Sequence, residues 1–437
     1  MYTLEREFKA IVNTVRFNER ISPKFNRNLQ FKKVQSILNY AAENSPAYKN
    51  WLSEVDISLS KFEDFRRIPV LTKNKLRTAL SSGQMKPPNF GKNDLVCGST
   101  TGSTGHPMTI FFDRRCSRIH NNGLSRVFHR LGIRSNHRVM KVWRKKPKTK
   151  KELNLIKNGY LYIIYIEDLE SGSYSELRSI IENIATFNPH VIRGYASGLY
   201  ELFKILKNDI NRLKDLKLII SSAEYLSSAV WDFIESASGK KVINLYGGTE
   251  APLIALSSEI TRNMTLCEDR YFVEVLDEDG TPTIPGKTGL ITITDLYSRA
   301  TPLIRYQIGD LAVIPDTFYD YTDQERFVIA VEGRSNDIFF LPSGEKIFTH
   351  VWYIIFREEN WIDQFQVVQR GDLSVDIYIK PYFMNYPKFS ALRILVEKKF
   401  KNLKFSWHIV EKINTNGQRK FSAVKSEVGL GYNGLNK

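Results

Sequence analysis

The chain has 437 residues, of which 42% are apolar and 25% are charged, and its 63 lysines and arginines exceed its 47 acids for a formal charge of +16. This composition is typical of a globular protein with ample core material, and it excludes disordered, fibrous and membrane-spanning chains. At roughly 100–200 residues per domain, the length predicts two or three domains, or one large and one small domain. The positive charge favours anionic ligands such as nucleotides, nucleic acid, anionic lipid or an acidic polysaccharide.

The three cysteines, Cys97, Cys116 and Cys267, are odd in number and far apart. This usage favours neither a disulfide framework nor a structural zinc site, and it indicates a reducing compartment. The first residues mix acids, bases and apolar side chains, unlike a secretory signal. No run reaches the ~18–20 apolar residues that a membrane helix needs. We therefore expect a cytoplasmic protein with no integral membrane segment.

The N-terminal part begins with a helical pattern, because apolar residues recur at three- and four-residue spacing between Val34 and Ala41. Further on, the segment IPVLTKNKLR (68–77) places Thr72 where it can cap a short helix. Between residues 142 and 295, short apolar runs alternate with helical segments, which predicts parallel α/β layers.

From residue 272 the pattern changes to alternating strands separated by Asp-Gly and Pro-Gly turns, which indicates a β-rich subdomain. After Gly333, about a hundred residues mix strands with a helix around 383–400, as in a small α+β lid. We place the boundary near 334–337. The predicted fold class is α/β, with a large N-terminal domain (1–335) and a small C-terminal α+β domain (336–437).

The run STTGSTGHP (99–107) is the strongest local motif. Its glycines let backbone N–H groups turn inward and its hydroxyls add donors, so the loop can bind phosphate oxygens. It lacks the Lys-Ser/Thr pair of a Walker loop, and a polar turn is the alternative.

The second motif is NLYGGTEAP (244–252), where an apolar strand leads into an aromatic ring, two glycines, a hydroxyl and a carboxylate. Tyr246 can stack on a base, Thr249 can donate to a phosphate and Glu250 can hold a hard cation. An ordinary strand-to-helix turn with Thr249 as the helix cap is the alternative.

The third motif, TPLIRYQIGDLAVI (301–314), predicts a buried strand that carries Arg305 and ends in Gly309 and Asp310. A carboxylate at a strand end can accept both hydroxyls of a ribose, although a surface turn also fits. The fourth, EGRSNDIFFLPSGEKI (332–347), contains Arg334 at the proposed boundary.

In this order, the four motifs resemble those of the adenylate-forming superfamily of acyl-CoA synthetases and related ligases. Further matches resemble its phenylacetate-CoA ligase branch, which includes the CapK-type proteins of capsule polysaccharide biosynthesis. They are SILNYAAENSPAYK (36–49), IPVLTKNKLR (68–77), SSAEYLS (221–227) and PLIRYQIGD (302–310). The resemblance spans nearly the whole chain. It implies that 1–335 bind ATP and an acid and that 336–437 form a mobile lid.

The resemblance also implies the reaction: a carboxylic acid and ATP form an acyl-adenylate, and the acyl group then passes to a thiol or an amine. The implied partners are a small carboxylic acid, ATP, Mg²⁺ and either CoA or an amine that a sugar or peptide carries. An anionic carboxylate must approach an anionic phosphate, so donors and a cation must surround the phosphates.

By resemblance, the 101–105 loop holds the β- and γ-phosphates, Glu250 binds Mg²⁺ and Thr249 contacts the α-phosphate. Tyr246 and residues 222–224 flank adenine, and Asp310 and Arg334 hold the ribose. The residues thus implied for the nucleotide are Thr101, Gly102, Ser103, Thr104, Gly105, Ser222, Ala223, Glu224, Tyr246, Gly247, Asp310 and Arg334.

The segment RGYASGLYEL, which starts at Arg193, forms part of the acid pocket in relatives. It makes Tyr195, Ala196 and Gly248 candidates for the pocket wall. The positive charge of Arg193 suits an anionic or sugar-like acid, or it forms a structural ion pair.

The superfamily uses a lysine in a Gly-Lys context near the C-terminus, but here Gln418 follows Gly417. Lys420 is our candidate for this catalytic charge, beside Glu250 and Thr249, and Arg419 is the alternative; a solvated basic strand also fits. Asn336 occupies the position about which relatives rotate their small domain.

An alternative from another class is a catalytically weakened relative that binds nucleotide or an anionic polymer. Gln418 and the positive charge suggest it. No nucleic-acid-binding module accompanies the charge, so we do not expect specific nucleic-acid binding.

Overall fold

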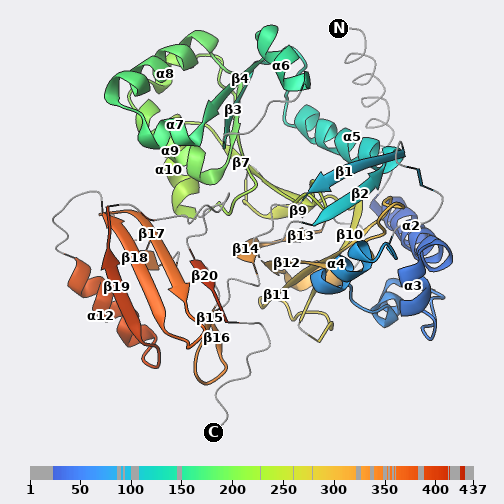
Figure 1. The fold of residues 1–437 in the computed structure, drawn as a ribbon. Helices are drawn as coiled ribbons and strands as arrows, with labels where there is room; N and C mark the ends of the chain where they lie inside the picture. Colours follow the sequence, from blue (N-terminus) through green and yellow to red (C-terminus); the bar gives the residue numbers. More distant parts are fainter. Residues whose placement is uncertain are drawn as a thin grey trace.

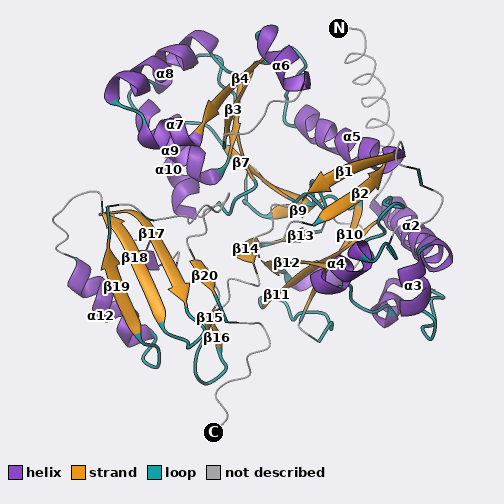
Figure 2. Ribbon diagram, in the orientation of Figure 1, coloured by secondary structure: helices purple, strands orange, loops and turns teal. Residues whose placement is uncertain are grey.

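The structure is a computed structural model. It describes residues 23–85, 90–91, 94–99, 108–144, 150–226, 228–258, 260–277, 279–320, 326–334, 339–347, 352, 355–356, 359, 361–381, 388–411, 413 and 424–428. Figures 1 and 2 show helices and sheets in a large N-terminal part, followed by a smaller sheet with one face covered by a helix. This arrangement confirms the predicted α/β class.

The first described elements are helical: α2 (Pro23–Asn44), α3 (Pro46–Trp51), the 3₁₀-helix η1 (Phe62–Arg67) and α4 (Lys73–Ser81). The predicted apolar stripe of α2 is buried, with Val34, Leu38 and Ala41 fully enclosed. Thr72 caps α4 as expected, because its hydroxyl oxygen accepts a hydrogen bond from the backbone N–H of Lys75 at 3.3 Å.

A hairpin of β1 (Leu95–Ser99) and β2 (Thr109–Asp113) follows. Ser99 pairs with Thr109 at its end, so the hydroxyl- and glycine-rich loop connects these two residues. Asp113 then caps α5 (Arg114–Arg130) through a hydrogen bond from the backbone N–H of Cys116 at 2.8 Å.

An eight-stranded sheet is the centre of the large part. Five of its strands are parallel neighbours, and antiparallel strands extend one edge. In spatial order the strands are β13 (Phe327–Val328), β9 (Met264–Leu266), β8 (Ala255–Ser257), β7 (Val242–Tyr246), β6 (Leu218–Ser222), β5 (Val191–Gly194), β3 (Val139–Trp143) and β4 (Leu161–Tyr165).

Both faces of this sheet are buried, as parallel strands require. Ile220 and Ile243 belong to one apolar cluster, whereas their chain neighbours Ile219 and Val242 belong to another. The second cluster includes side chains from helices that lie between the strands in sequence, which confirms the predicted alternation (Figure 2). These connecting elements are α6 (Lys150–Lys157), α7 (Ile166–Ser171), α8 (Tyr174–Phe187), α9 (Ala196–Leu206), η3 (Ile210–Arg212) and α10 (Ser228–Ser238).

The predicted β-rich subdomain is an antiparallel sheet of β10 (Tyr271–Leu276), β11 (Thr288–Asp295), β12 (Tyr306–Val313) and β14 (Ala330–Arg334), with the short helix η4 (Asp316–Tyr319) between β12 and β14. The buried Arg305 fixes the start of β12. Its guanidinium contacts the Glu274 carboxylate at 3.1 Å and donates to the carbonyls of Ile68 and Gly280 at 2.6 and 3.2 Å. Because a buried charge needs such partners, Arg305 ties three segments together.

The C-terminal part has its own apolar core around a sheet of β19 (Phe405–Ile409), β18 (Val375–Pro381), β17 (Ile362–Gln369) and β20 (Val424–Ser426). Before it come the short strands β15 (Phe339–Phe340) and β16 (Lys346–Ile347). The expected helix is α12 (Phe389–Lys399), which begins several residues later than predicted. In the described part of the chain, no helix combines the length and hydropathy that a bilayer span needs.

Two stacked histidines lie just before β3 and β5, where the imidazole rings of His137 and His190 are 4.6 Å apart. Each Nδ1 accepts a backbone N–H, from Arg134 at 3.2 Å and from Arg138 at 3.1 Å respectively. Burial, together with nearby positive charges such as Lys217, lowers the pKa of both rings. Both are therefore held in the neutral form.

This pair predicts a loss of stability in acid. The folded-state pKa values lie below the unfolded value of about 6.5, so the unfolded chain binds more protons and stability falls as the pH drops from there through the folded values. We expect the free energy of unfolding in urea to fall more between pH 7.5 and 5.5 in the wild type than in His137→Asn/His190→Asn, whose amide oxygens can still accept the backbone N–H groups. Equal losses in the two proteins would contradict this assignment.

Candidate active site

Three sequence motifs meet at one edge of the eight-stranded sheet, because the carboxyl ends of parallel strands lie together there. Gly194 at the end of β5 pairs with Ser221, and Ser222 at the end of β6 pairs with Leu245 of β7. The structure thus brings together residues 193–196, 222–224 and 246–250, which sequence analysis assigned to the acid pocket and the nucleotide.

A hydrogen bond joins this edge to the four-stranded sheet. The Tyr246 hydroxyl, after β7, donates to Oδ2 of Asp310 in β12 at 2.8 Å. Asp310 in turn pairs in register with Arg334 of β14. The residues predicted to contact the base and the ribose are therefore adjacent, although 64 positions separate Tyr246 from Asp310.

The turn after Tyr246 is compact. The Gly248 N–H donates to the Ala251 carbonyl at 2.8 Å, and the Ile254 N–H donates to the Tyr246 carbonyl at 2.8 Å. A Cβ at Gly247 would lie 2.6 Å from the Pro252 carbonyl oxygen, so only glycine fits there. The chain continues into β8 and not into a helix, so the alternative of Thr249 as a helix cap is wrong.

Thr249 packs against the hairpin that carries the phosphate-loop candidate. An ideal Cβ on Gly98 in β1 would lie 2.8 Å from Thr249 Cγ2, so the backbone and the side chain approach closely. Gly98 is next to Ser99, where the loop begins. Thr101, Gly102, Ser103, Thr104 and Gly105 themselves lie outside the described residues.

Glu250 is 7% exposed and faces a basic residue that sequence analysis did not assign to the site. Lys73 Nζ lies 3.8 Å from its carboxylate. Lys73 comes from the 68–77 segment. This segment reaches the site because Leu71 forms a parallel bridge with Tyr306, the first residue of β12. No local pattern around Lys73 indicates this long-range contact.

Tyr306 completes this part of the site. Its hydroxyl is buried and interacts with the nearby Glu250 carboxylate, without a well-formed hydrogen bond to any described residue. Burial, followed by the negative charges of Glu250 and Asp310, raises its pKa well above the usual range. The hydroxyl therefore stays protonated beside two carboxylates, whose negative charge suits a hard cation.

The loop after β6 places its backbone at the site and turns its carboxylate elsewhere. Ala223 has a positive φ of 70°, which bends the chain sharply. Glu224 Oε2 accepts from the Ser197 N–H at 3.0 Å and from its hydroxyl at 2.7 Å, so it caps α9. Ser222 and the backbone of Ala223 remain as the part of this loop that can flank a base.

Of the acid-pocket candidates, Ala196 is the first residue of α9 and is 4% exposed within the core. Tyr195 is partly exposed and lies against Trp143, with ring centroids 4.4 Å apart. Gly248 is exposed. Lys420, Arg419, Gln418 and Asn336 lie outside the described residues, so the catalytic lysine and the hinge stay predictions.

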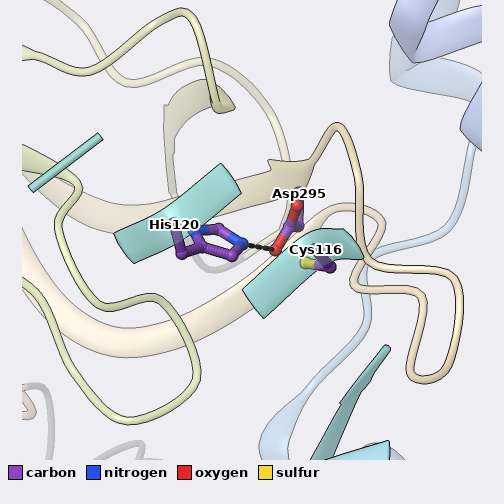
Figure 3. A group of neighbouring side chains, drawn as sticks. All are labelled: Cys116, His120 and Asp295. Carbon is purple, nitrogen blue, oxygen red and sulfur yellow. Dashed lines mark hydrogen bonds and ion pairs between the residues drawn. The ribbon is translucent and has the colours of Figure 1, made fainter. Parts of the chain in front are cut away.

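A separate buried group contains metal-ligating side chains: the nearest such atoms of Cys116, His120 and Asp295 all lie within 4.8 Å of one another. Figure 3 shows the His120 ring pointing at Asp295, with Nε2 and Oδ2 2.9 Å apart. The other ring nitrogen contacts the Tyr271 hydroxyl at 2.8 Å. Both nitrogens are therefore in use, and burial with nearby carboxylates raises the pKa of the Cys116 thiol. We interpret the group as a hydrogen-bonded contact between α5 and β11.

No protein-family model matches the chain. It is similar to a phenylacetate-coenzyme A ligase of Thermus thermophilus, with 24% identity over 80% of this chain and 79% of the relative. It is also similar to protein CapK of Staphylococcus aureus, with 25% identity over 91% of this chain and 89% of CapK. Among solved structures, 2-hydroxyisobutyryl-CoA ligase in a postadenylation state shares the fold, with a TM-score of 0.70, 18% identity and coverage of 93% and 90% of the two chains.

The sequence relatives confirm the resemblance to the phenylacetate-CoA ligases and CapK that the motifs indicated. The solved structure shows that the chain has the fold of an acyl-CoA ligase that forms an acyl-AMP. Together they support the resemblance to the adenylate-forming superfamily.

The close contact between Gly98 and Thr249 leads us to predict how substitutions there change stability. Gly98→Ala should lower the free energy of unfolding by about 1–3 kcal/mol, because the new methyl group overlaps Thr249 Cγ2. Thr249→Ser removes that methyl group and keeps the hydroxyl. Gly98→Ala/Thr249→Ser should therefore be more stable than Gly98→Ala alone, as measured by urea unfolding. Simple addition of the two single costs would show that the residues do not touch.

Proposed function

We propose that the chain uses ATP to activate a carboxylic acid as an acyl-adenylate and then transfers the acyl group to a thiol or an amine. The hydrogen bond between Tyr246 and Asp310 carries this proposal. It brings an aromatic ring suited to adenine next to a carboxylate suited to ribose. The turn that follows Tyr246 presents Thr249 and Glu250, which suit the phosphates and a cation.

The physical obstacle in this reaction is repulsion between the attacking carboxylate and the α-phosphate. Thr249 would supply a hydroxyl donor, and the 101–105 loop would supply backbone N–H groups to the outer phosphates. Glu250 would hold Mg²⁺, which when bound neutralises phosphate charge. The fit rests on the buried carboxylate of Glu250, which lies close to the Tyr306 hydroxyl and, with Asp310, places negative charge there.

The remaining roles follow the family pattern. The Tyr246 ring and the backbone at Ser222 and Ala223 would enclose adenine, and Asp310 with Arg334 would hold the ribose. Lys420 would bring a positive charge to the reacting groups in the adenylation step. Rotation about Asn336 would then exchange the residues of the small domain for the transfer step.

Two acceptors fit this proposal, and a different relative suggests each one. Phenylacetate-coenzyme A ligases transfer to CoA, as their name states. CapK motivates the second acceptor, an amine on a capsule or cell-wall precursor, and with it a role in capsule polysaccharide biosynthesis. Adding CoA or amines in turn to the preformed adenylate separates the two.

ATP–pyrophosphate exchange tests the activation step. The wild type should exchange pyrophosphate only when an acid is present, assayed with a panel of aryl, fatty, amino and uronic acids. Glu250→Gln should lower the rate by about 100-fold or more, because it removes the charge that would hold the cation. Glu182→Gln is a matched control, since Glu182 is an exposed carboxylate on α8 that pairs with Arg212.

The exchange experiment also separates the ligase from the rival function. If properly folded wild type gives no exchange with any acid in the panel, the catalytically weakened nucleotide-binding relative replaces the ligase. If Glu250→Gln and Glu182→Gln exchange at the wild-type rate, the site is not where we place it.

A further inference from the structure

Arg193 is a partly buried cation near the end of β5, beside the acid-pocket candidates. It pairs in register with Lys141 of β3, and its side chain lies between the sheet and α5. The guanidinium carbon lies 5.7 Å from the centre of the Phe128 ring and 5.9 Å from that of Trp143. Within the described residues, its one hydrogen bond runs from Nε to the Ser222 hydroxyl at 3.4 Å, near the limit of such contacts.

Within the described residues, the Arg193 guanidinium has no carboxylate partner, whereas nearby bases do. Lys141 pairs with Glu152 at 2.9 Å, and Arg144 approaches Glu224 at 3.6 Å. Burial lowers the pKa of Arg193, and the nearby Tyr195 hydroxyl partly offsets this by raising it. Arg193 is therefore a partly buried positive charge without a counter-charge among the described residues.

Arg305 shows how this chain satisfies a purely structural arginine. Its guanidinium contacts Glu274 and donates to the backbone carbonyls of Arg66, Ile68 and Gly280. Arg193 has two aromatic faces instead, which stabilise a guanidinium but do not accept its in-plane N–H groups. Donors in that plane are what a planar carboxylate binds.

The neighbours of Arg193 connect it to the substrate side of the site. Tyr195 is two residues along the chain, and its ring contacts Trp143, one of the two rings near the guanidinium. Ser222, which accepts the single hydrogen bond, begins the segment that flanks adenine in our proposal. An acid whose reacting end lies at the nucleotide would direct its far end toward this cluster.

We propose that Arg193 binds a second carboxylate on the acid, so that the enzyme activates dicarboxylic acids in preference to monocarboxylic acids of the same length. This inference rests on the proposed acid activation and names its substrate class. A uronic acid carries a single carboxylate, which activation uses, and would leave the guanidinium unpaired.

The test compares matched acids: butyrate with succinate, hexanoate with adipate, and phenylacetate with 4-carboxyphenylacetate. In ATP–pyrophosphate exchange, the wild type should show a kcat/KM about 10–100-fold higher for the diacid in at least one pair, as expected for a charge-assisted contact. Arg193→Gln should reduce that ratio to about one. Arg193→Lys should keep an intermediate ratio, because lysine retains the charge but lacks the planar pair of N–H donors. Arg178→Gln, an exposed arginine on α8 that pairs with Asp209, should keep the full ratio.

Three results would overturn the inference. The first is a wild type with no preference for the diacid in any pair. The second is folded Arg193→Gln and Arg193→Lys proteins that keep the wild-type ratio. Equal losses for diacid and monoacid with a raised KM for ATP would assign the guanidinium to the nucleotide.

Failure of the proposed function is distinguishable from failure of this inference. If no acid supports exchange, the ligase proposal fails, but the diacids still probe Arg193 without ATP. Millimolar adipate, succinate or 4-carboxyphenylacetate should then raise the melting temperature of the wild type and not that of Arg193→Gln. No shift in either protein would reject the second-carboxylate site.

Discussion

The hydrogen bond from Tyr246 to Asp310 links the eight-stranded sheet to the four-stranded sheet. Tyr246 ends a strand of the eight-stranded sheet, and Asp310 lies in the four-stranded one. Arg305 positions the strand that carries Asp310, because its bonds to Glu274 and to the carbonyl of Ile68 fix the start of β12. The geometry of the proposed nucleotide site therefore depends on how these two sheets are held together.

Charge is distributed unevenly around this junction. The chain carries a formal charge of +16, yet the described centre of the site presents the carboxylates of Glu250 and Asp310 around the Tyr306 hydroxyl. This pair of carboxylates favours a cation, and a cation in turn favours phosphates. Two nearby basic residues differ in their partners. Lys73 approaches the Glu250 carboxylate at 3.8 Å, whereas Arg193 has no carboxylate partner within the described residues.

Local sequence patterns predicted most elements and the order of the motifs, because strand and helix periodicity and glycine-rich turns are properties of neighbouring residues. They could not predict Lys73 beside Glu250, since that contact depends on the bridge between Leu71 and Tyr306. The group of Cys116, His120 and Asp295 was missed for the same reason, as the aspartate is 175 positions from the histidine. The helix-cap alternative for Thr249 failed because the chain turns into an antiparallel strand instead.

The most direct test of this account is a double-mutant cycle on the KM for ATP in pyrophosphate exchange. Tyr246→Phe keeps the ring but removes the hydroxyl that positions Asp310, so it should raise KM about 5- to 30-fold in the wild-type background. In the Asp310→Ala background the hydroxyl has nothing to position, and the same substitution should change KM by less than about twofold. If Tyr246→Phe raises KM equally in both backgrounds, the hydrogen bond between the two sheets does not build the nucleotide site.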